Sequence, residues 1–140
     1  MLRLVLDTDV VVAALRSRSG ASRALLIAAT DGRFTMAVSV PLFLEYEAVL
    51  TRRTHLLAAG LTELEVVGVL NGLANVFEPV AMHFRWRPLM RDPDDDMVME
   101  TALNGRADAL VTFNRRDYLE GARLFGIEPI LPVDALRRLG

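Results

Sequence analysis

Short aliphatic runs alternate along this chain with longer segments in which apolar residues recur at helical spacing. The short runs, bounded by charged and turn-forming residues, predict strands at 2–6, 34–39, 76–82, 109–112 and 129–131. The longer segments predict helices at 8–16, 21–30, 41–53, 61–76, 93–104 and 133–139, with a loop at 83–91. Strands and helices that alternate in this way indicate a parallel sheet covered by helices.

The length of 140 residues predicts a single domain over residues 1–140, built as a three-layer α/β/α sandwich around a central parallel sheet. The apolar content of 52% exceeds the globular average, which suits a sheet covered on both faces and a subunit interface. No apolar run approaches the roughly 20 residues that span a bilayer, and the start lacks the features of a signal peptide. We therefore expect a cytoplasmic protein that contacts no membrane.

Charge and cysteine content exclude several kinds of chemistry. The chain has no cysteine, so disulfides and thiolate metal sites are excluded, and all 16 basic residues are arginines, so no mechanism can require a lysine. The net charge of −2 argues against general binding to duplex nucleic acid. The adjacent Arg115 and Arg116 have the planar donors that suit phosphate. Such arginines, including the group Arg85, Arg87 and Arg91, are otherwise solvated surface residues.

Two aspartates follow the first predicted strand with one residue between them. The apolar Leu2, Leu4 and Leu6 place that strand in the core. Asp7 and Asp9 are therefore expected at its carboxyl end, where open parallel sheets bind ligands. Two carboxylates at this edge suit a hard cation such as Mg²⁺. Alternatively, either aspartate caps the helix that follows, and the segment alone does not decide between the two interpretations.

A second group of acids lies in the turn R-D-P-D-D-D at residues 91–96. Asp92 followed by Pro93 is typical of a helix N-cap, and acids in the first turn complement the helix dipole. Capping does not require three consecutive aspartates at 94–96, which repel one another unless a cation lies between them. The cluster therefore favours a metal site over a simple cap.

Helical phase indicates which of these aspartates faces inward. An apolar stripe follows Asp95 at helical spacing and consists of Val98, Met99 and Ala102. The same stripe counted from Asp96 would include Glu100, a charge that is costly to bury. We therefore expect Asp95 to face inward, Asp96 to be the second choice, and Glu100 to lie outside the core.

Two further segments supply oxygen ligands. Glu45 lies on the apolar stripe of the helix predicted at 41–53, where an acid either has an arginine partner or sits at the margin of the stripe. The strand at 109–112 ends in Thr112 and is followed by Asn114 and Asp117, which offer hydroxyl, amide and carboxylate oxygens. By itself, Asn114 is more typical of a cap for the next helix.

These four segments occur in an order that resembles the PIN-domain nucleases. The sequence has D-T-D after the first strand, a glutamate on a mid-chain helix, D-P-D-D-D at a helix start and V-T-F-N-R-R-D after a later strand. The resemblance covers essentially the whole chain and is strongest to the VapC-like toxins of toxin–antitoxin pairs. It implies a PIN-like fold and Mg²⁺- or Mn²⁺-dependent cleavage of RNA by metal-activated water.

The resemblance also implies roles for single residues. Asp7, Glu45 and Asp95 match the acidic triad of the family, and Asn114 stands at its variable fourth acidic position with Asp117 nearby. The predicted catalytic residues are therefore Asp7, Glu45, Asp95 and Asp117. The predicted metal ligands are Asp7, Asp95, Asp96 and Asn114, and the predicted substrate contacts are Thr112, Arg115 and Arg116.

The chain departs from the family pattern at two positions. Asp9 stands where the family often has asparagine, so it either adds charge to the site or faces away. Asn114 replaces an acid, which makes one catalytic metal as plausible as two unless Asp117 or Asp96 substitutes. As partners, the resemblance implies an RNA substrate, a small antitoxin that inserts a peptide into the acidic cleft, and a second copy of the chain in a homodimer.

Two alternative functions fit parts of the sequence. The opening L-V-L-D-T-D-V-V also resembles the haloacid-dehalogenase phosphatases, in which the first aspartate is the nucleophile. That family needs a downstream lysine, and this chain has none. The other alternative is a catalytically degenerate PIN fold that serves only as a binding module. Evidence against it is the presence of all three acids, Asp7, Glu45 and Asp95.

Overall fold

The computed structural model describes residues 1–83 and 93–140, and for residues 93 and 94 it describes the backbone alone. Several sequence predictions therefore lie outside the described residues. These are the cap at Asp92, the side chain of Asp94, the loop after His83, and the group Arg85, Arg87 and Arg91.

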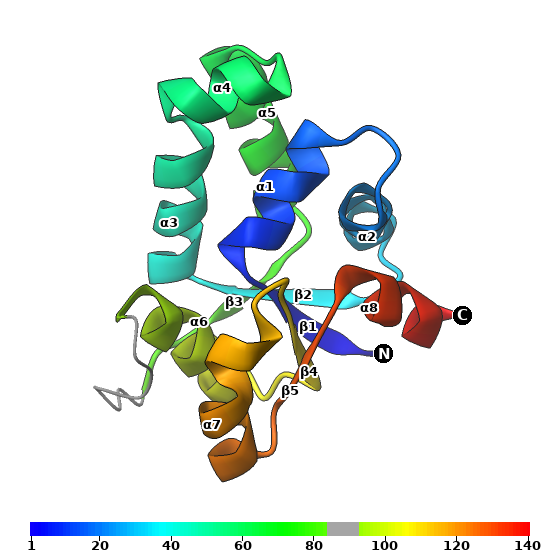
Figure 1. Cartoon of the computed structure of the whole chain (residues 1–140), viewed down its shortest axis with the longest axis vertical. Coiled ribbons are helices and arrows are strands. Elements are labelled where there is room, and N and C mark those ends of the chain that lie inside the picture. The colour runs from blue at the N-terminus through cyan, green and yellow to red at the C-terminus, as the bar shows by residue number, and fades with distance from the viewer. Residues whose placement is uncertain (84–92) are drawn as a thin grey trace.

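In the described part of the chain, five parallel strands form one sheet with β1 (Arg3–Leu6) at its centre (Figure 1). The order is β3 (Glu78–Val80), β2 (Thr35–Ser39), β1, β4 (Ala109–Val111) and β5 (Glu128–Ile130). Leu4 of β1 pairs with Met36 of β2 and with Ala109 of β4. Leu4 has no exposed surface, as expected for a central strand that is covered on both faces.

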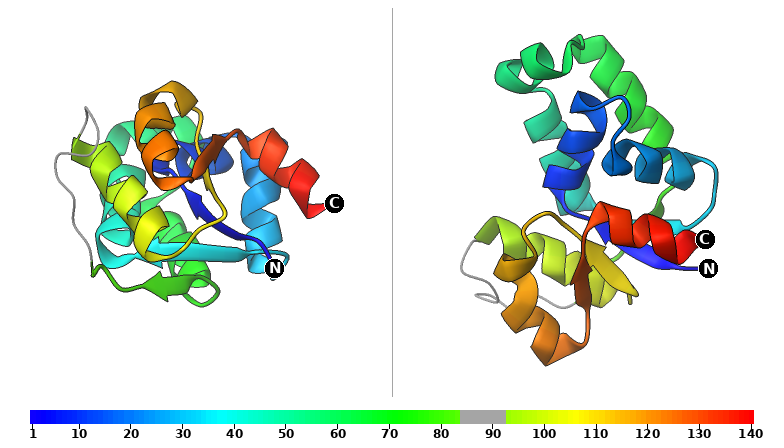
Figure 2. Two further views of the ribbon diagram at one scale, coloured as in Figure 1. Left: turned by 90° about the horizontal axis from the view of Figure 1, so that it is seen from below. Right: turned by 45° about the vertical axis from the view of Figure 1, so that its right-hand side comes forward.

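Helices cover both faces of this sheet and complete a three-layer α/β/α sandwich, which confirms the predicted fold class (Figures 1 and 2). One layer consists of α1 (Thr8–Arg16), α2 (Ala21–Thr30), α3 (Val40–Leu50), α4 (Arg53–Ala59) and α5 (Glu63–Ala74). The other contains α6 (Pro93–Asn104) and α7 (Arg115–Phe125), which lie side by side in both views of Figure 2. The last helix, α8 (Pro132–Leu139), packs against α2.

Two helices depart from the predicted pattern. The helix predicted at 41–53 ends at Leu50, and a separate helix, α4, begins at Arg53. Arg52 has extended backbone angles (φ −62°, ψ 137°), so the chain turns there. The helix α7 is not among the predicted ranges, because glycine and alanine occupy two of the three positions on its buried face, Tyr118, Gly121 and Ala122, and weaken the apolar pattern there.

The helices α4 and α5 meet in a sharp turn. Gly60 ends α4 in the left-handed region (φ 68°), which glycine adopts without a steric penalty. A capping box then begins α5: the Glu65 amide donates to the Thr62 hydroxyl, and the Thr62 amide donates to the Glu65 carboxylate. No single helix of the described residues is long and apolar enough to cross a membrane. As a pair, α4 and α5 have that length and composition, but they are bent by 88°.

The connections of the sheet diverge at β1 and β4. From β1 the chain proceeds through α1 and α2 to β2 on one side, whereas β4 leads through α7 to β5 on the other. Connections that diverge from neighbouring parallel strands leave a crevice at the carboxyl ends, where such sheets bind ligands. The amino ends of α1 and α7 lie at this edge, and their N–H groups favour negative charge there.

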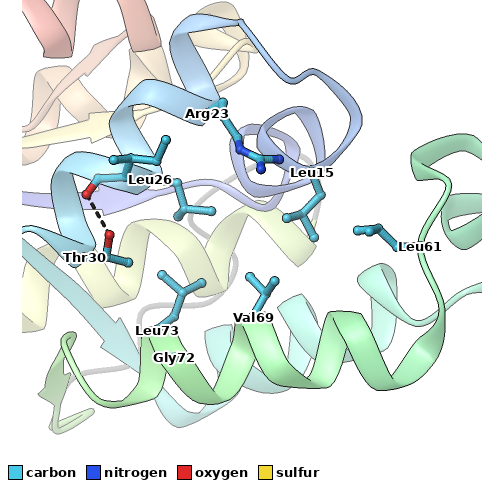
Figure 3. Close-up of a pocket in the computed structure, with 9 residues that line it drawn as sticks. Leu15, Arg23, Leu26, Thr30, Leu61, Val69, Gly72 and Leu73 are labelled. Atoms are coloured by element: carbon cyan, nitrogen blue, oxygen red, sulfur yellow. Dashed lines mark hydrogen bonds between the residues drawn. The ribbon is translucent and has the colours of Figure 1, made fainter.

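An apolar groove of about 300 Å³ lies between α1, α2 and α5 (Figure 3). Leucine, isoleucine and valine side chains form most of its walls, together with the polar Arg23 and Thr30. Among the described residues that line it, none carries a carboxylate and none is a predicted site residue. The groove therefore offers neither ligands for a hard cation nor a general base.

Gly105, which follows α6, lies too close to its neighbours to accept a side chain. A Cβ atom there would lie 2.9 Å from the Thr101 carbonyl oxygen and 2.9 Å from Cγ2 of Val80. We predict that Gly105→Ala lowers the free energy of unfolding by about 1–3 kcal/mol, as overpacking does. Urea denaturation followed by circular dichroism measures this difference.

Gly68→Ala is the matched control for this prediction. Gly68 lies within α5, and a Cβ atom there has no neighbour within 4 Å. Because alanine favours the helix over glycine, this variant should raise the free energy of unfolding by about 0.5–1 kcal/mol. Equal effects of the two substitutions would show that the close approach of Gly105 to Val80 has no energetic consequence.

Candidate active site

Asp7 lies at the junction of β1 and α1. Its backbone N–H donates a 2.8 Å hydrogen bond to the Val111 carbonyl of β4 and so extends the sheet by one residue. Its side chain caps α1, because Oδ1 accepts from the Thr8 amide over 2.8 Å. The capping interpretation is therefore confirmed for Asp7, but it occupies only one carboxylate oxygen. The residue is 7% exposed, so the other oxygen also needs partners inside the protein.

Two hydroxyl groups reach that second oxygen, Oδ2 of Asp7. Thr112 Oγ1 donates to it over 2.8 Å, and the Tyr118 hydroxyl lies 3.2 Å away. Thr112 Oγ1 also accepts a 2.9 Å hydrogen bond from the backbone N–H of Asn114, which links Asp7 to the loop after β4. Thr112 has no exposed surface, so the structure does not support its predicted contact with substrate. Its hydroxyl orients Asp7 instead.

The helix α6 brings Asp95 to the same place. The Tyr118 hydroxyl donates to Asp95 Oδ1 over 2.9 Å and is thus shared between Asp95 and Asp7. Asp95 is half-buried, whereas Asp96 is 2% exposed. The expected order of burial is therefore wrong, because Asp96 is the more deeply buried of the two, whereas Asp95 is the one that shares a hydroxyl group with Asp7.

The expectation that Glu100 lies outside the core is wrong. Glu100 has no exposed surface, and it is buried together with the stripe predicted on the same helix, Val98, Met99 and Ala102. Helical phase identifies the inward residues only where a helix buries one narrow face. Because α6 packs against β1, β2 and β4 and also against α3 and α7, its buried arc is wider than one stripe.

Asp9, in the first turn of α1, binds the loop after β4. Its Oδ2 accepts two hydrogen bonds of 3.1 Å each, one from the backbone N–H of Phe113 and one from the side-chain amide of Asn114. Of the two alternatives for Asp9, the structure thus supports an acid that belongs to the site. Its other oxygen, Oδ1, is buried and has no hydrogen-bond partner among the described residues. An orphaned buried carboxylate oxygen is a natural ligand for a cation.

The start of α7 supplies the remaining residues of this edge. Asn114 is the N-cap residue of α7, but its side chain makes no capping hydrogen bond. Its side-chain NH₂ group donates to Asp9 instead. The charge of Asp117 lies close enough to Asp7 to contribute to the raised pKa of Asp7. The exposed residues of the first turn are Arg115, Arg116 and Asp117.

Two carboxyl groups at this edge, those of Asp7 and Asp9, have raised pKa values. Burial raises the pKa of Asp7, although hydrogen bonds from its neighbours oppose that shift. Burial and then the charge of Asp7 raise the pKa of Asp9 from the ordinary 3.8 to about 7. Burial, with the charges of Asp7 and Asp95, raises the pKa of Tyr118 far above its ordinary value, so its hydroxyl stays protonated.

Glu45 is not joined to this group. It is half-buried on α3, at the margin of a buried face that consists of Leu42, Tyr46 and Leu50. Within the described part of the chain, no three His, Cys, Asp or Glu side chains lie close enough together to hold a metal ion. The structure therefore does not assemble Asp7, Glu45 and Asp95 into one three-carboxylate group.

The residues at this edge nonetheless fit a hard divalent cation. The carboxylates of Asp7 and Asp95 share one hydroxyl group, and Asp9 has an orphaned buried oxygen. All of these donors are oxygens, which Mg²⁺ and Mn²⁺ prefer. Mg²⁺ commonly binds through one or two carboxylates and completes its shell with water and substrate phosphate, so three converging acids are not required.

Two buried tyrosines, of which only Tyr118 contacts carboxylates of the site, are not evident from the sequence. Tyr118 joins the two carboxylates, and the hydroxyl of Tyr46 donates to the Leu6 carbonyl at the end of β1. Both are almost completely buried. The available signal for Tyr118 is its spacing from Gly121 and Ala122 on one face of α7, which becomes apparent only when that helix is known.

Fold and site together define a parallel α/β domain whose carboxylates gather where its two central strands end. The model of the PIN domain family matches residues 3–116, which run from β1 to the start of α7. The chain therefore belongs to the PIN domain family, and the predicted family is confirmed. The phosphatase alternative, which belongs to another family, is set aside.

A solved structure shares this fold. The chain is similar to one in the crystal structure of VapBC2 from Rickettsia felis bound to a DNA fragment from their promoter. The TM-score is 0.62 at 15% identity, over 91% of this chain and 97% of that chain. At this identity the likeness shows the fold alone. No curated protein matches the sequence significantly.

The raised pKa of Asp9 predicts that the protein in EDTA loses stability as the pH rises. The unfolded chain releases this proton near pH 3.8, whereas the folded chain keeps it up to about pH 7. Between these values the folded state binds more protons, so the free energy of unfolding falls with increasing pH. We expect the urea midpoint to be lower at about pH 8 than at about pH 5.

Asp9→Asn tests which group titrates. Its amide oxygen still accepts from Phe113 and Asn114, but it has no proton to release, so the difference between the two pH values should shrink. Asp31→Asn, on the exposed C-cap of α2, should keep the wild-type difference. An unchanged pH dependence in Asp9→Asn would show that this carboxyl is not responsible.

Proposed function

We propose that this protein is an endoribonuclease that depends on Mg²⁺ or Mn²⁺ and is the toxin of a toxin–antitoxin pair. The observation that carries the proposal is the pairing of Asp7 and Asp95 on one buried hydroxyl at the carboxyl end of β1. Membership of the PIN domain family supports it. A degenerate PIN fold that only binds a partner is the alternative that experiment must exclude.

The proposed chemistry needs a cation held by Asp7 and Asp95, with Asp96 and Asn114 as further candidate ligands. The bound cation would polarise the phosphodiester and activate water for attack on phosphorus. The chain itself contributes orientation, because the Thr8 amide and the Thr112 hydroxyl fix both oxygens of Asp7. Asp117, exposed at the start of α7, is the proposed catalytic carboxylate that takes up a proton.

Arg115 and Arg116 are the proposed contacts to the RNA backbone. Both are exposed in the first turn of α7, at the acidic edge. A guanidinium group can donate two hydrogen bonds to phosphate at once, which offsets repulsion between RNA and the carboxylates. With a net charge of −2, the protein has little general attraction for nucleic acid, so such local contacts must carry binding. Single-stranded RNA suits this edge because its bases can be gripped individually.

Two protein partners complete the proposal. A small antitoxin would insert a peptide at the acidic edge, with an arginine that neutralises the carboxylates. A second copy of the chain would form a homodimer in the cytoplasm. Exposed apolar side chains on α3, α4 and α5 support such an interface, namely Val40, Leu44, Leu57 and Leu64.

Cleavage of a labelled single-stranded RNA with Mn²⁺ or Mg²⁺ tests the proposed activity. We expect EDTA to abolish cleavage. Asp7→Asn and Asp95→Asn should each reduce it by more than the roughly 10- to 100-fold typical of losing an outer-shell partner. Asp31→Asn is the same chemical change at an exposed position and should cleave at the wild-type rate. Metal binding without cleavage of any of several RNAs would favour the degenerate binding module.

Glu45→Gln tests the proposed contribution of α3. The half-buried Glu45 lies outside the pair formed by Asp7 and Asp95, so we expect it to act on water around the cation rather than as a direct ligand. Its loss should lower metal-dependent cleavage by about 10-fold, the effect typical of an outer-shell carboxylate. Glu47→Gln, on the exposed face of the same helix, should have no effect. Equal rates for the two variants would remove Glu45 from the proposed site.

A further inference from the structure

A single buried hydroxyl group joins the two carboxylates on which the proposed function depends. The Tyr118 hydroxyl lies 2.9 Å from Asp95 Oδ1 and 3.2 Å from Asp7 Oδ2. The residue has no exposed surface, so this hydroxyl is not available to contact RNA directly. Any effect of Tyr118 on the reaction must therefore pass through the carboxylates.

The hydroxyl has one proton for two acceptors. The shorter distance favours donation to Asp95, and Asp7 Oδ2 already accepts from Thr112 over 2.8 Å. Burial together with the two carboxylate charges raises the pKa of Tyr118, so the group remains a neutral donor. A neutral hydroxyl between two like charges keeps their oxygens near each other without adding to their repulsion.

The packing of Tyr118 suits a side chain that keeps two carboxylates at a fixed separation. Its ring belongs to the buried face of α7, and α7 packs against α6, the helix that carries Asp95. Asp7 is fixed independently, through its amide bond to Val111 and its cap on α1. Tyr118 therefore links a carboxylate held by the sheet to a carboxylate held by the opposite helical layer.

We propose that Tyr118 is a positioning residue that holds Asp7 and Asp95 at the separation at which they bind one divalent cation together. The inference rests on the proposed function, because it requires a cation at this edge. Substitution of a residue that orients a metal ligand commonly lowers metal affinity as much as it lowers activity. Affinity is therefore the quantity to measure.

The first test compares the affinity of the full chain for Mn²⁺, measured by the electron paramagnetic resonance of free Mn²⁺. Tyr118→Phe keeps the ring and removes the hydroxyl, and we expect it to weaken binding about 10-fold. Tyr46→Phe is the matched control, because it removes a buried hydroxyl that donates to the Leu6 carbonyl rather than to a carboxylate. It should bind Mn²⁺ within about twofold of the wild type.

A double-mutant cycle separates positioning from a general effect on the fold. In an Asp95→Ala background the Tyr118 hydroxyl has no acceptor on residue 95, so the proposed link is already broken and adding Tyr118→Phe should cause little further loss of Mn²⁺ affinity. A purely structural role for the hydroxyl would weaken binding equally in both backgrounds. That additive result would overturn the proposal.

Fluorine NMR provides a readout that does not depend on the variants folding. The chain has only two tyrosines, so labelling with 3-fluorotyrosine gives one resonance each for Tyr46 and Tyr118. Saturating Mg²⁺ should shift the Tyr118 resonance more than that of Tyr46, because only the Tyr118 hydroxyl contacts the two proposed ligands. A Tyr118 resonance that Mg²⁺ leaves in place would overturn the proposal.

Different results would contradict the proposed function and the positioning role of Tyr118. Wild-type protein that binds no Mn²⁺ would contradict the proposed function itself. Wild-type protein that binds Mn²⁺, with Tyr118→Phe binding equally or more tightly, would contradict only the positioning role of Tyr118. Loss of affinity in Tyr118→Phe with retention in Tyr46→Phe supports both.

Discussion

The burial of like charges where β1 and β4 end is the constraint on which this site depends. Asp7 is held there by the sheet and by the first turn of α1, and its charge helps to raise the pKa of Asp9 to about 7. Each donor that stabilises these carboxylates lies on a segment that begins or ends at the same edge. The placement of β4 beside β1 brings these segments together, which is why the strand order matters for function.

The site draws on both helical layers. The first layer supplies Asp9, whereas the second supplies Asp95 and Tyr118. The helix α6 also buries Asp96 and Glu100 almost completely, although buried acids are expensive even when they have partners. Stability alone would favour apolar residues at such positions. Acids concentrated on one buried helix therefore indicate that this part of the chain serves a function as well as the fold.

The elements that could be predicted from the sequence are those with strong local sequence patterns. The bounds of α1, α2 and α6 match the predicted ranges because turn residues, or a proline in the case of α6, interrupt their apolar patterns sharply. The placement of Asp7 and Asp95 at one edge also follows from topology, since a helix that connects two parallel strands begins at the edge where the first of them ends. The contacts of Tyr118 do not, because they depend on the packing of α7 against α6. The burial of Glu100 likewise reflects contacts with several elements, which no single-helix pattern contains.

The same charges bear on the order in which a nucleic acid and a cation would bind. Asp7, Asp9, Asp95 and Asp117 place carboxylates at one edge, against which Arg115 and Arg116 set two positive charges. A phosphate brought to this edge meets like charge in surroundings where two charges 4 Å apart interact by about 4 kcal/mol. A divalent cation held by two of the carboxylates reverses the sign of that interaction for the scissile phosphate. In the proposed mechanism the cation is therefore a condition for binding RNA as well as for cleaving it.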